Sequence, residues 1–160
     1  NLSFFAHKRV FENLHQRFSY IFETVNKYPG APTIDEIEID ENTPFLLGDK
    51  HIIPIEAFHG KLPVLGFKID DVAYLTDVKT IAKSELEKLK GIEVLIINAL
   101  RHEKHHSHLN LAEALELIKE IKPKKTYLTH ISHLLGFHKE VEKTLPKNVY
   151  LAYDTLKLKL

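Results

Sequence analysis

The stretch Thr126-Tyr-Leu-Thr-His-Ile-Ser-His133 carries the most information about this chain. Its first four residues are β-branched, aromatic or aliphatic and predict a short buried strand, which delivers His130 and then His133 at its C-terminal end. A strand is a rigid mount, and imidazole is the commonest protein ligand for zinc-like ions and the usual proton carrier near neutral pH. The stretch therefore predicts a histidine site at the end of a buried strand.

Two other predicted strands end in residues of the same kind. The run Ile53-Pro-Ile-Glu-Ala-Phe-His59 ends in His59 and is followed by Gly60, and the run Ala73-Tyr-Leu-Thr-Asp77 ends in Asp77. Three strand ends that each carry a metal-ligand residue type indicate a metal-dependent hydrolase site. Plainer interpretations stay open, because His59 can be a surface-loop histidine and Asp77 a helix cap.

A histidine-rich segment, Arg101-His-Glu-Lys-His-His-Ser-His108, accounts for four of the 11 histidines in the chain. Its simplest interpretation is a solvated polar loop. The functional alternative is a lip over an active site that places a general acid, a general base or a phosphate ligand. The order His59, Asp77, His108 and His130, each expected at the mouth of the same face, favours the functional alternative more than any single residue does.

Composition excludes several classes of protein. The 160 residues include 44% hydrophobic residues, enough for a real core, and the 22 Lys and Arg balance the 22 Asp and Glu. This balance gives no overall field that would draw the chain to nucleic acid or to an anionic membrane. The absence of cysteine excludes disulfides and thiolate metal sites, so that any metal must be held by His and carboxylates. Without a disulfide pattern or a visible leader, we expect a cytoplasmic protein.

The pattern of apolar residues predicts a single α/β domain over residues 1–160, with mixed sheets and outer helices. Only Leu2-Ser-Phe-Phe5 precedes the first predicted helix as a strand, so the first sheet looks shortened. A capping box is expected at Ser84 and another at Asn110. The predicted helices cover residues 6–26, a short stretch from 84, a longer one from 110, and 134–145. The predicted strands cover residues 33–39, 51–58, 64–69, 72–76, 94–97, 126–129, 148–153 and 156–160.

In combination the motifs resemble a known family. In chain order they are Phe58-His-Gly-Lys-Leu-Pro-Val-Leu-Gly-Phe67, Tyr74-Leu-Thr-Asp77, Ser107-His-Leu-Asn-Leu-Ala-Glu-Ala-Leu115, Leu128-Thr-His-Ile-Ser-His133 and Tyr153-Asp154. Together they resemble the metallo-β-lactamase-fold hydrolases, and most closely the branch typified by phosphoribosyl 1,2-cyclic phosphate phosphodiesterase, a neighbour of ribonuclease Z. The resemblance runs from about residue 6 to the end and implies an αββα sandwich with mixed sheets.

The resemblance also implies roles for single residues. His59 corresponds to a ligand of the first of two divalent ions, zinc or manganese, Asp77 to the carboxylate that bridges both ions, and His130 to a ligand of the second ion. His108 corresponds to a histidine near the bound phosphate, a candidate catalytic proton donor, for which we expect an ordinary pKa near 6.5. Such an ion pair activates a water for attack on phosphorus. Three further residues are candidates for substrate binding: His105, His133 and Asp154.

The family hallmark, His-x-His-x-Asp-His, supplies four of the seven metal ligands and has no match in this chain. We therefore expect the chain to be the C-terminal two-thirds of a longer hydrolase domain, with partial or no metal occupancy by itself. The alternative is a scaffold of the same fold that has lost catalysis.

The expected function is that of a binuclear phosphodiesterase for a small cyclic phosphate or a nucleotide-like phosphodiester. The alternatives are a non-catalytic or truncated scaffold module and a ribonuclease Z-like RNA-processing enzyme. Binding of RNA calls for a basic arm or patch, and the balanced charge argues against one. Four lysines close together in the sequence could nevertheless form a local basic patch. The expected partner is a small-molecule phosphodiester, with no membrane and no nucleic acid, and a homodimer is left open. The four lysines are Lys119, Lys122, Lys124 and Lys125.

Overall fold

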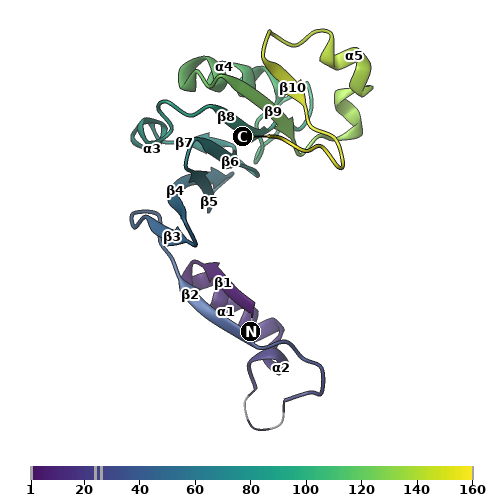
Figure 1. Cartoon of the computed structure of the whole chain (residues 1–160). Helices are drawn as coiled ribbons and strands as arrows, with labels where there is room; N and C mark the ends of the chain where they lie inside the picture. The colour runs from purple at the N-terminus through teal and green to yellow at the C-terminus, as the bar shows by residue number, and fades with distance from the viewer. Residues whose placement is uncertain (1, 24, 26, 160) are drawn as a thin grey trace. The chain divides into compact units, whose positions relative to one another are not determined.

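The computed structural model describes residues 2–23, 25 and 27–159 (Figure 1). The chain forms two compact units, Asn1–Thr43 and Pro44–Leu160. The prediction of one domain over residues 1–160 stays a prediction. No helix within the described residues is long and apolar enough to cross a bilayer.

The first unit is a small αβ assembly around one pair of strands. Its strands pair in parallel, with Leu2 opposite Ile34, and a parallel pair needs a long crossover, which here contains two helices. The predicted helix over residues 6–26 is shorter in the structure, because it breaks at Phe18. Phe11 is its buried residue. The elements are β1 (Leu2–Ala6), α1 (Lys8–Arg17), α2 (Ser19–Phe22) and β2 (Ile34–Glu38).

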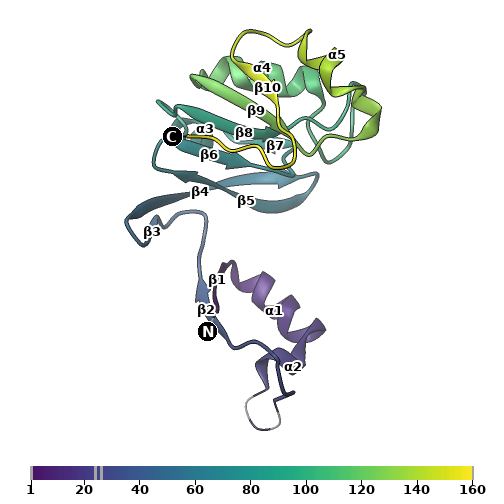
Figure 2. The same cartoon turned by 45° about the vertical axis from the view of Figure 1, so that its right-hand side comes forward.

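The second unit is built on one mixed sheet of eight strands, in the order β10-β9-β8-β6-β5-β4-β3, with β7 paired to β4 (Figure 2). This arrangement confirms the predicted α/β class with a mixed sheet. The strands are β3 (Phe45–Leu47), β4 (Lys50–His59), β5 (Leu62–Ile69), β6 (Val72–Leu75), β7 (Thr80–Ile81), β8 (Val94–Asn98), β9 (Lys125–Thr129) and β10 (Val149–Leu151). The helices are α3 (Lys83–Lys88), α4 (Leu111–Ile121), the short 3₁₀ helix η1 (His133–Leu135) and α5 (His138–Glu142).

Strand direction decides where the ends of these strands lie. β6, β8, β9 and β10 are mutually parallel, so their C-terminal ends share one edge of the sheet. β4 and β6 are both antiparallel to β5, and β4 therefore ends at the same edge. The residues that end or follow β4, β6 and β9 are His59, Asp77 and His130. The fold thus brings the three predicted strand ends to one side of the sheet.

The core of the second unit lies along the middle strands. Ile55, Leu75, Leu95, Ile97 and Leu128 are completely buried. The register of the strands places all five on one face of the sheet, which forms the core, while residues of the other face such as Tyr74 remain exposed. These rigid strands provide the mount from which the polar residues of the edge project.

Three local predictions are decided by hydrogen bonds and pairing. The Asn110 capping box is present, because its side chain accepts from the Glu113 N–H while the Glu113 carboxylate accepts from the Asn110 N–H. The Ser84 capping box is wrong: α3 has Ala82 as its N-cap, and Ser84 lies within the first turn. The strand predicted over residues 156–160 is also wrong, because residues 156–159 pair with no strand, while Leu160 lies outside the described residues.

Helix α4 is tied to the segment after Asp77 by an ion pair. The Lys79 ammonium donates to both carboxylate oxygens of Glu113, at 2.9 and 2.8 Å. Burial opposes ionisation of Glu113, but the hydrogen bonds from Lys79 and from the Asn110 N–H lower the pKa of this carboxyl below its usual 4.5. Glu113 thus joins the start of α4 to the edge of the sheet.

We predict that Glu113→Gln lowers the free energy of unfolding at pH 7 by about 1–2 kcal/mol, because a charged acceptor of three hydrogen bonds is lost. Since the folded state lowers this pKa, the difference between variant and wild type is complete above the unfolded value of 4.5 and disappears as the pH falls through the folded value. Urea unfolding between pH 7 and pH 3 measures it. Glu116→Gln, an exposed residue paired with Lys119 on the same helix, is the control and should change stability by less than about 0.5 kcal/mol. A pH-independent difference for Glu113→Gln would contradict the assignment.

Candidate metal centre

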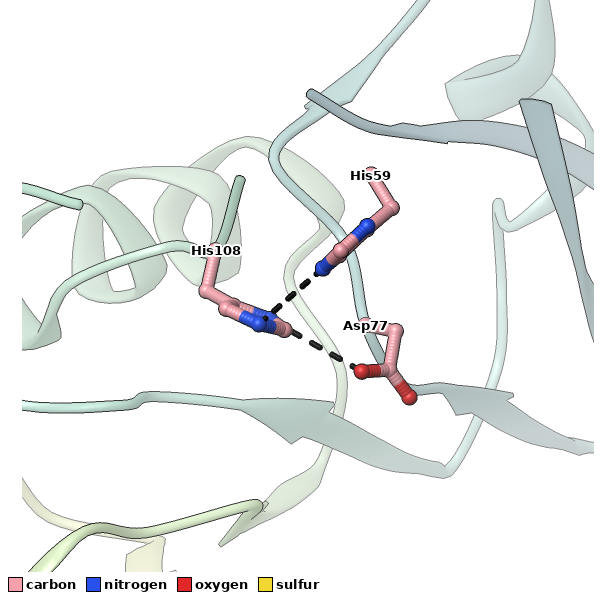
Figure 3. A group of neighbouring side chains, drawn as sticks. All are labelled: His59, Asp77 and His108. Carbon is pink, nitrogen blue, oxygen red and sulfur yellow. Dashed lines mark hydrogen bonds and ion pairs between the residues drawn. The ribbon is translucent and has the colours of Figure 1, made fainter. Parts of the chain in front are cut away.

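Four polar side chains meet at the edge where β4, β6 and β9 end. The His59 and His108 rings lie edge to face, with their Nε2 atoms 3.1 Å apart. Asp77 Oδ1 lies 3.8 Å from His108 Nδ1 and 3.5 Å from His130 Nε2. Figure 3 shows His59 and His108 facing each other, with the Asp77 carboxylate turned toward His108. One oxygen of the Asp77 carboxylate therefore lies near both His108 and His130, whose rings are also neighbours, with centroids 4.7 Å apart.

Three of these residues could hold one metal ion. Among the described residues, His59, Asp77 and His108 form a group whose ligand atoms all lie within 4.8 Å of one another, and His130 is not a member of it. Two atoms that each lie about 2.0–2.2 Å from a shared ion can be at most about 4.4 Å apart. The two short distances in this group are within that limit but involve different nitrogens of His108, Nε2 toward His59 and Nδ1 toward Asp77, so His108 would offer only one of them to an ion. The group differs from the predicted set of His59, Asp77 and His130 in containing His108.

The His108 ring is the most deeply placed member of the site. The residue is 9% exposed, and no described residue hydrogen-bonds its buried Nδ1. An unpartnered buried nitrogen is unfavourable unless a ligand or an ion satisfies it. Together with a carboxylate and a second imidazole, this nitrogen makes a donor set that suits a divalent cation such as Zn²⁺ or Mn²⁺.

Burial, together with the neighbouring imidazoles of His130 and His59, lowers the pKa of His108 to about 4, while Asp77 opposes the shift. The expectation of an ordinary pKa near 6.5 for His108 is therefore wrong. The sequence did not reveal this, because the burial of the ring, the largest cause, is decided by the tertiary structure. At neutral pH the ring is neutral, the form in which histidine binds metals.

Two of the candidate ligands have an unusual backbone. Asp77 has φ 58° and His130 has φ 54°, in the left-handed region, which non-glycine residues adopt at a cost. His130 directly follows β9, and Asp77 is the second residue after β6; both strands belong to the parallel part of the sheet. The left-handed conformation turns the chain sharply at the strand end, so that the side chain stays at the edge.

Gly60 has φ 63° and opens the two-residue turn between β4 and β5. A Cβ atom at Gly60 would lie 3.5 Å from the Ser107 Cβ, an ordinary contact. The glycine is therefore explained by the turn, which needs a positive φ, and this turn fixes His59 as the last residue of β4.

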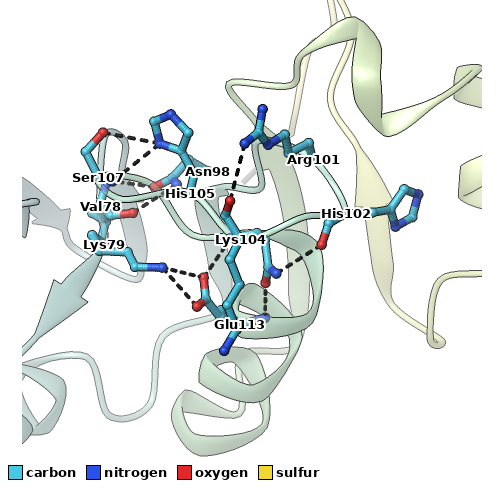
Figure 4. A network of polar contacts seen from close by, with 10 residues as sticks. Val78, Lys79, Asn98, Arg101, His102, Lys104, His105, Ser107 and Glu113 are labelled. Carbon is cyan, nitrogen blue, oxygen red and sulfur yellow. Dashed lines mark hydrogen bonds and ion pairs between the residues drawn. The ribbon is translucent and has the colours of Figure 1, made fainter.

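The predicted substrate-binding residues lie at different distances from the group. The His105 ring stacks on the His108 ring with centroids 5.0 Å apart, and its Nδ1 accepts from the Ser107 N–H at 3.3 Å (Figure 4). Asp154 lines a pocket of about 250 Å³ together with His130. His133 is exposed in η1, and the structure places it in no contact with the site. His105 and Asp154 are thus connected with the site, and His133 is not.

Two residues that support the site were not singled out from the sequence. Asn98 ends β8 at the same edge and is completely buried. Lys79 follows Asp77 and pairs with Glu113. The signal for Asn98 was available, because it is a polar residue that ends an apolar strand, as His59 ends β4. Nothing in the sequence around Lys79 distinguishes it from the other lysines.

The motifs and the site match a known family. Residues 1–131 match the family model described as the beta-lactamase superfamily domain. The chain belongs to the beta-lactamase superfamily. Its resemblance to the metallo-β-lactamase-fold hydrolases is thereby confirmed, including the likeness to the cyclic-phosphate branch, because a structure of that branch is among the similar ones.

Several solved structures share the fold of this superfamily member. A structure described as a new diphosphatase from the PhnP family is 31% identical, has a TM-score of 0.87, and is matched over 98% of this chain and 57% of its own. The metallo-beta-lactamase fold protein YhfI from Bacillus subtilis is 20% identical, with a TM-score of 0.69, over 94% of this chain and 62% of that one. Human tRNase Z, short form, is 16% identical, with a TM-score of 0.65, over 96% and 66%. The last two show likeness of fold alone.

One curated protein matches the chain closely in sequence. It is called octanoyltransferase, from Porphyromonas gingivalis (strain ATCC BAA-308 / W83), and is 37% identical over 156 residues, 97% of this chain and 32% of that protein. The chain therefore spans about a third of that relative and a little over half of the diphosphatase chain.

We predict that Asp77→Asn and Asp77→Ala both lose binding of Zn²⁺, because each removes the charged oxygen ligand. Only Asp77→Ala should also lower the metal-free stability, by about 1 kcal/mol, since Asn adopts the left-handed backbone more readily than Ala. Isothermal titration with Zn²⁺ and thermal unfolding in a chelator separate the two effects. Zn²⁺ binding by Asp77→Asn with the affinity of the wild type would remove Asp77 from the ligand set.

Proposed function

We propose that these residues form part of the active site of a metal-dependent hydrolase that cleaves a phosphoryl bond, a phosphodiester or a diphosphate, in a small substrate. The observation that carries the proposal is that one oxygen of the Asp77 carboxylate lies near two imidazoles. Asp77 Oδ1 is 3.8 Å from His108 Nδ1 and 3.5 Å from His130 Nε2, and His59 lies beside His108. A carboxylate has two oxygens, so Asp77 could serve two ions held by different imidazoles.

The residues that would hold the metal are His59 and Asp77 for one ion and Asp77 and His130 for a second, with His108 close to both. A bound divalent ion would lower the pKa of a water and neutralise the charge that develops on phosphorus. Asp77 brings one negative charge to the centre, and the neutral imidazoles add none, so most of the positive charge of an ion remains for the substrate.

His108 has two possible tasks in this centre, and its contacts define both. Its ring faces His59 through Nε2 and Asp77 through Nδ1, and as a ligand it would offer one of these nitrogens to the ion. The alternative is the role implied by the family resemblance, in which His108 gives a proton to the departing oxygen. A bound phosphate would favour the protonated ring, because it adds negative charge beside a buried imidazole. We propose the proton-donor role, and metal content is the measurement that separates the two.

The part of the substrate that does not react would occupy the pocket beside His130. The pocket is lined by Thr129, His130, Ile131, Ala152, Tyr153 and Asp154 and has a volume of about 250 Å³. Tyr153 is 59% exposed and offers an aromatic face, and the Asp154 carboxylate can accept hydrogen bonds from hydroxyl groups. This chemistry suits a sugar or nucleoside part attached to the phosphate. His105, on the other side of His108, is placed to contact the phosphate, and His133 has no task here.

The related proteins support the proposal unequally. The diphosphatase of the PhnP family is named for cleavage of a diphosphate, and it shares 31% of the aligned residues. The name octanoyltransferase describes a protein of which this chain matches 32%. The chain has no cysteine, so acyl transfer through a thioester has no nucleophile here. The tRNase Z structure shares the fold alone, and the balanced charge of the chain gives RNA cleavage no support.

We predict that the intact hydrolase domain, of which this chain is expected to be the C-terminal two-thirds, hydrolyses a small phosphodiester such as bis-p-nitrophenyl phosphate when supplied with Mn²⁺ or Zn²⁺. Asp77→Asn should lower kcat by at least about 10³-fold, because loss of metal-based stabilisation costs several kcal/mol. Release of p-nitrophenolate measures the rate. A five-membered cyclic phosphate and a dinucleotide joined by a diphosphate distinguish diester from diphosphate cleavage. A metal-loaded protein that cleaves none of the three would contradict the proposal.

His108→Gln should keep the metal content of the wild type and lower kcat by about 10²–10⁴-fold on substrates with poor leaving groups, the usual contribution of general acid catalysis. The loss should be much smaller on p-nitrophenyl esters, whose leaving group needs no proton. Elemental analysis and a series of leaving groups test this together. Loss of bound metal would instead make His108 a ligand.

We predict that Asp154→Asn raises KM about tenfold for a substrate with free hydroxyl groups, which corresponds to one hydrogen bond to a charged acceptor. KM for bis-p-nitrophenyl phosphate, which has no hydroxyl group, should not change. His133→Gln is the matched control, because His133 is exposed and outside the pocket. An equal change of KM for both substrates would show that Asp154 does not bind the hydroxyl groups of the non-reacting part of the substrate.

A further inference from the structure

The backbone of Val78, the residue after Asp77, is hydrogen-bonded through both its N–H and its carbonyl group. Its N–H donates to Asn98 Oδ1 at 2.8 Å, and its carbonyl accepts from Asn98 Nδ2 at 3.0 Å. The same carbonyl accepts a second hydrogen bond from the Leu109 N–H at 2.8 Å. Figure 4 shows the Asn98 side chain directed at Val78. Both backbone polar groups of Val78 are therefore hydrogen-bonded.

These bonds join the backbone neighbours of the candidate ligands. Val78 is adjacent to Asp77, and Leu109 is adjacent to His108. The next residue adds a further connection, because the Lys79 N–H donates to the carbonyl of Phe58, the residue before His59, at 2.7 Å. These hydrogen bonds connect residues 77–79, here called the Asp77 loop, to the backbone beside His59 and His108, the two other members of the three-residue group.

A fifth hydrogen bond connects the residue after Asn98 with the strand that carries His130. The N–H of Ala99, the residue after Asn98, donates to the carbonyl of Thr129, the residue before His130, at 3.0 Å. Asn98 itself lies opposite Thr129 in the pairing of β8 with β9. Asn98 is thus the one side chain in a network of backbone bonds that reaches all four candidate residues.

The chemistry of this position suits asparagine in particular. Its amide presents one donor and one acceptor in a plane, which matches the carbonyl and the N–H of a single residue, Val78. Asn98 is 0% exposed, so water cannot replace a lost bond. Aspartate has the same shape but sets a second oxygen against the Val78 carbonyl, where a donor is needed. Leucine would leave both peptide atoms of Val78 without these partners.

We infer that Asn98 is a positioning residue of the metal centre, which holds the Asp77 loop in register with His108 and His130. The inference rests on the proposed metal-dependent function. Asn98 touches none of the four candidate ligands through its own side-chain hydrogen bonds, so it acts through the Val78 peptide. Partners of this kind, one step removed from the metal, typically change metal affinity by about 10–100-fold.

A buried asparagine can also be needed for stability alone. The two roles differ in what they predict for the folded protein: a role in stability lowers the unfolding temperature and leaves the metal affinity of the folded molecules unchanged. A matched control is Leu95→Ala, because Leu95 is fully buried on the same strand, β8, and lies three residues from Asn98. It should lower the unfolding temperature by leaving a cavity in the core, without removing a hydrogen bond of Val78.

The experiment uses the metal-free protein, its Asn98→Asp variant and Leu95→Ala, titrated with Zn²⁺ and separately with Co²⁺ at a temperature where all are folded by circular dichroism. We expect Asn98→Asp to bind Zn²⁺ at least about tenfold more weakly than the wild type. Its Co²⁺ visible spectrum should change as well, because the ligand geometry is altered. Leu95→Ala should lower the unfolding temperature and keep the affinity and the spectrum. If Asn98→Asp does not fold, Asn98→Ser, which keeps one hydrogen-bonding group, takes its place.

The other possible outcomes contradict either the positioning role of Asn98 or the proposed metal site. Wild-type affinity and spectrum in the Asn98 variant, with binding intact in the wild type, overturn the positioning role and leave the proposed function standing. Equal weakening in the Asn98 variant and Leu95→Ala reduces the effect to stability and overturns the inference. A wild-type protein that binds neither Zn²⁺ nor Co²⁺ overturns the proposed metal site, and the positioning role with it.

Discussion

The two hydrogen bonds between the Asn98 amide and the Val78 peptide hold the edge of the sheet on which the candidate site stands. The segment after β6 must leave the sheet, turn through the left-handed conformation of Asp77, and still present its carboxylate to residues from three other segments. Such a conformation persists only where its surroundings determine it. Here the surroundings are a buried amide, the Leu109 N–H and the Phe58 carbonyl, none of which can be exchanged for water without loss.

The mixed direction of the strands has a consequence for the chemistry. In a fully antiparallel sheet of the same strand order, β8 would run in the opposite direction, and its end, with Asn98, would lie at the other edge from the ends of β4, β6 and β9. Two hairpin connections bring β4 and β6 into the same direction, and the helical crossovers add β8 and β9 to it. Ligand-bearing ends then gather at one edge, where backbone groups no longer needed for strand pairing are free to hold loops. The position of the site at the carboxyl ends of the strands follows from this topology.

The donor set also explains why a cation is the expected occupant. Four imidazoles, those of His59, His105, His108 and His130, surround one carboxylate, Asp77, in a partly buried site. Protonation of several rings at once is unfavourable because like charges repel, and burial lowers the pKa of His108 to about 4. Neutral rings present lone pairs to the centre, and a divalent ion satisfies them without adding protons. Membership of the beta-lactamase superfamily agrees with this chemistry, while the substrate is a matter of the neighbouring pocket.

The long strands of the second unit could be predicted from their apolar runs, and so could the polar residues that end them, whereas the short strands β3 and β7 could not, and the strand predicted over residues 156–160 is wrong. The sequence by itself also determined the Asn110 capping box, which needs only residues three positions apart. Only the tertiary structure decided that His108 lies beside His59 and Asp77 and is buried, since that depends on a loop folding back over the edge. The same holds for Asn98, whose partner is twenty positions away in the chain. Local patterns report what each segment does alone, whereas burial and ligand distances depend on segments that the sequence does not place together.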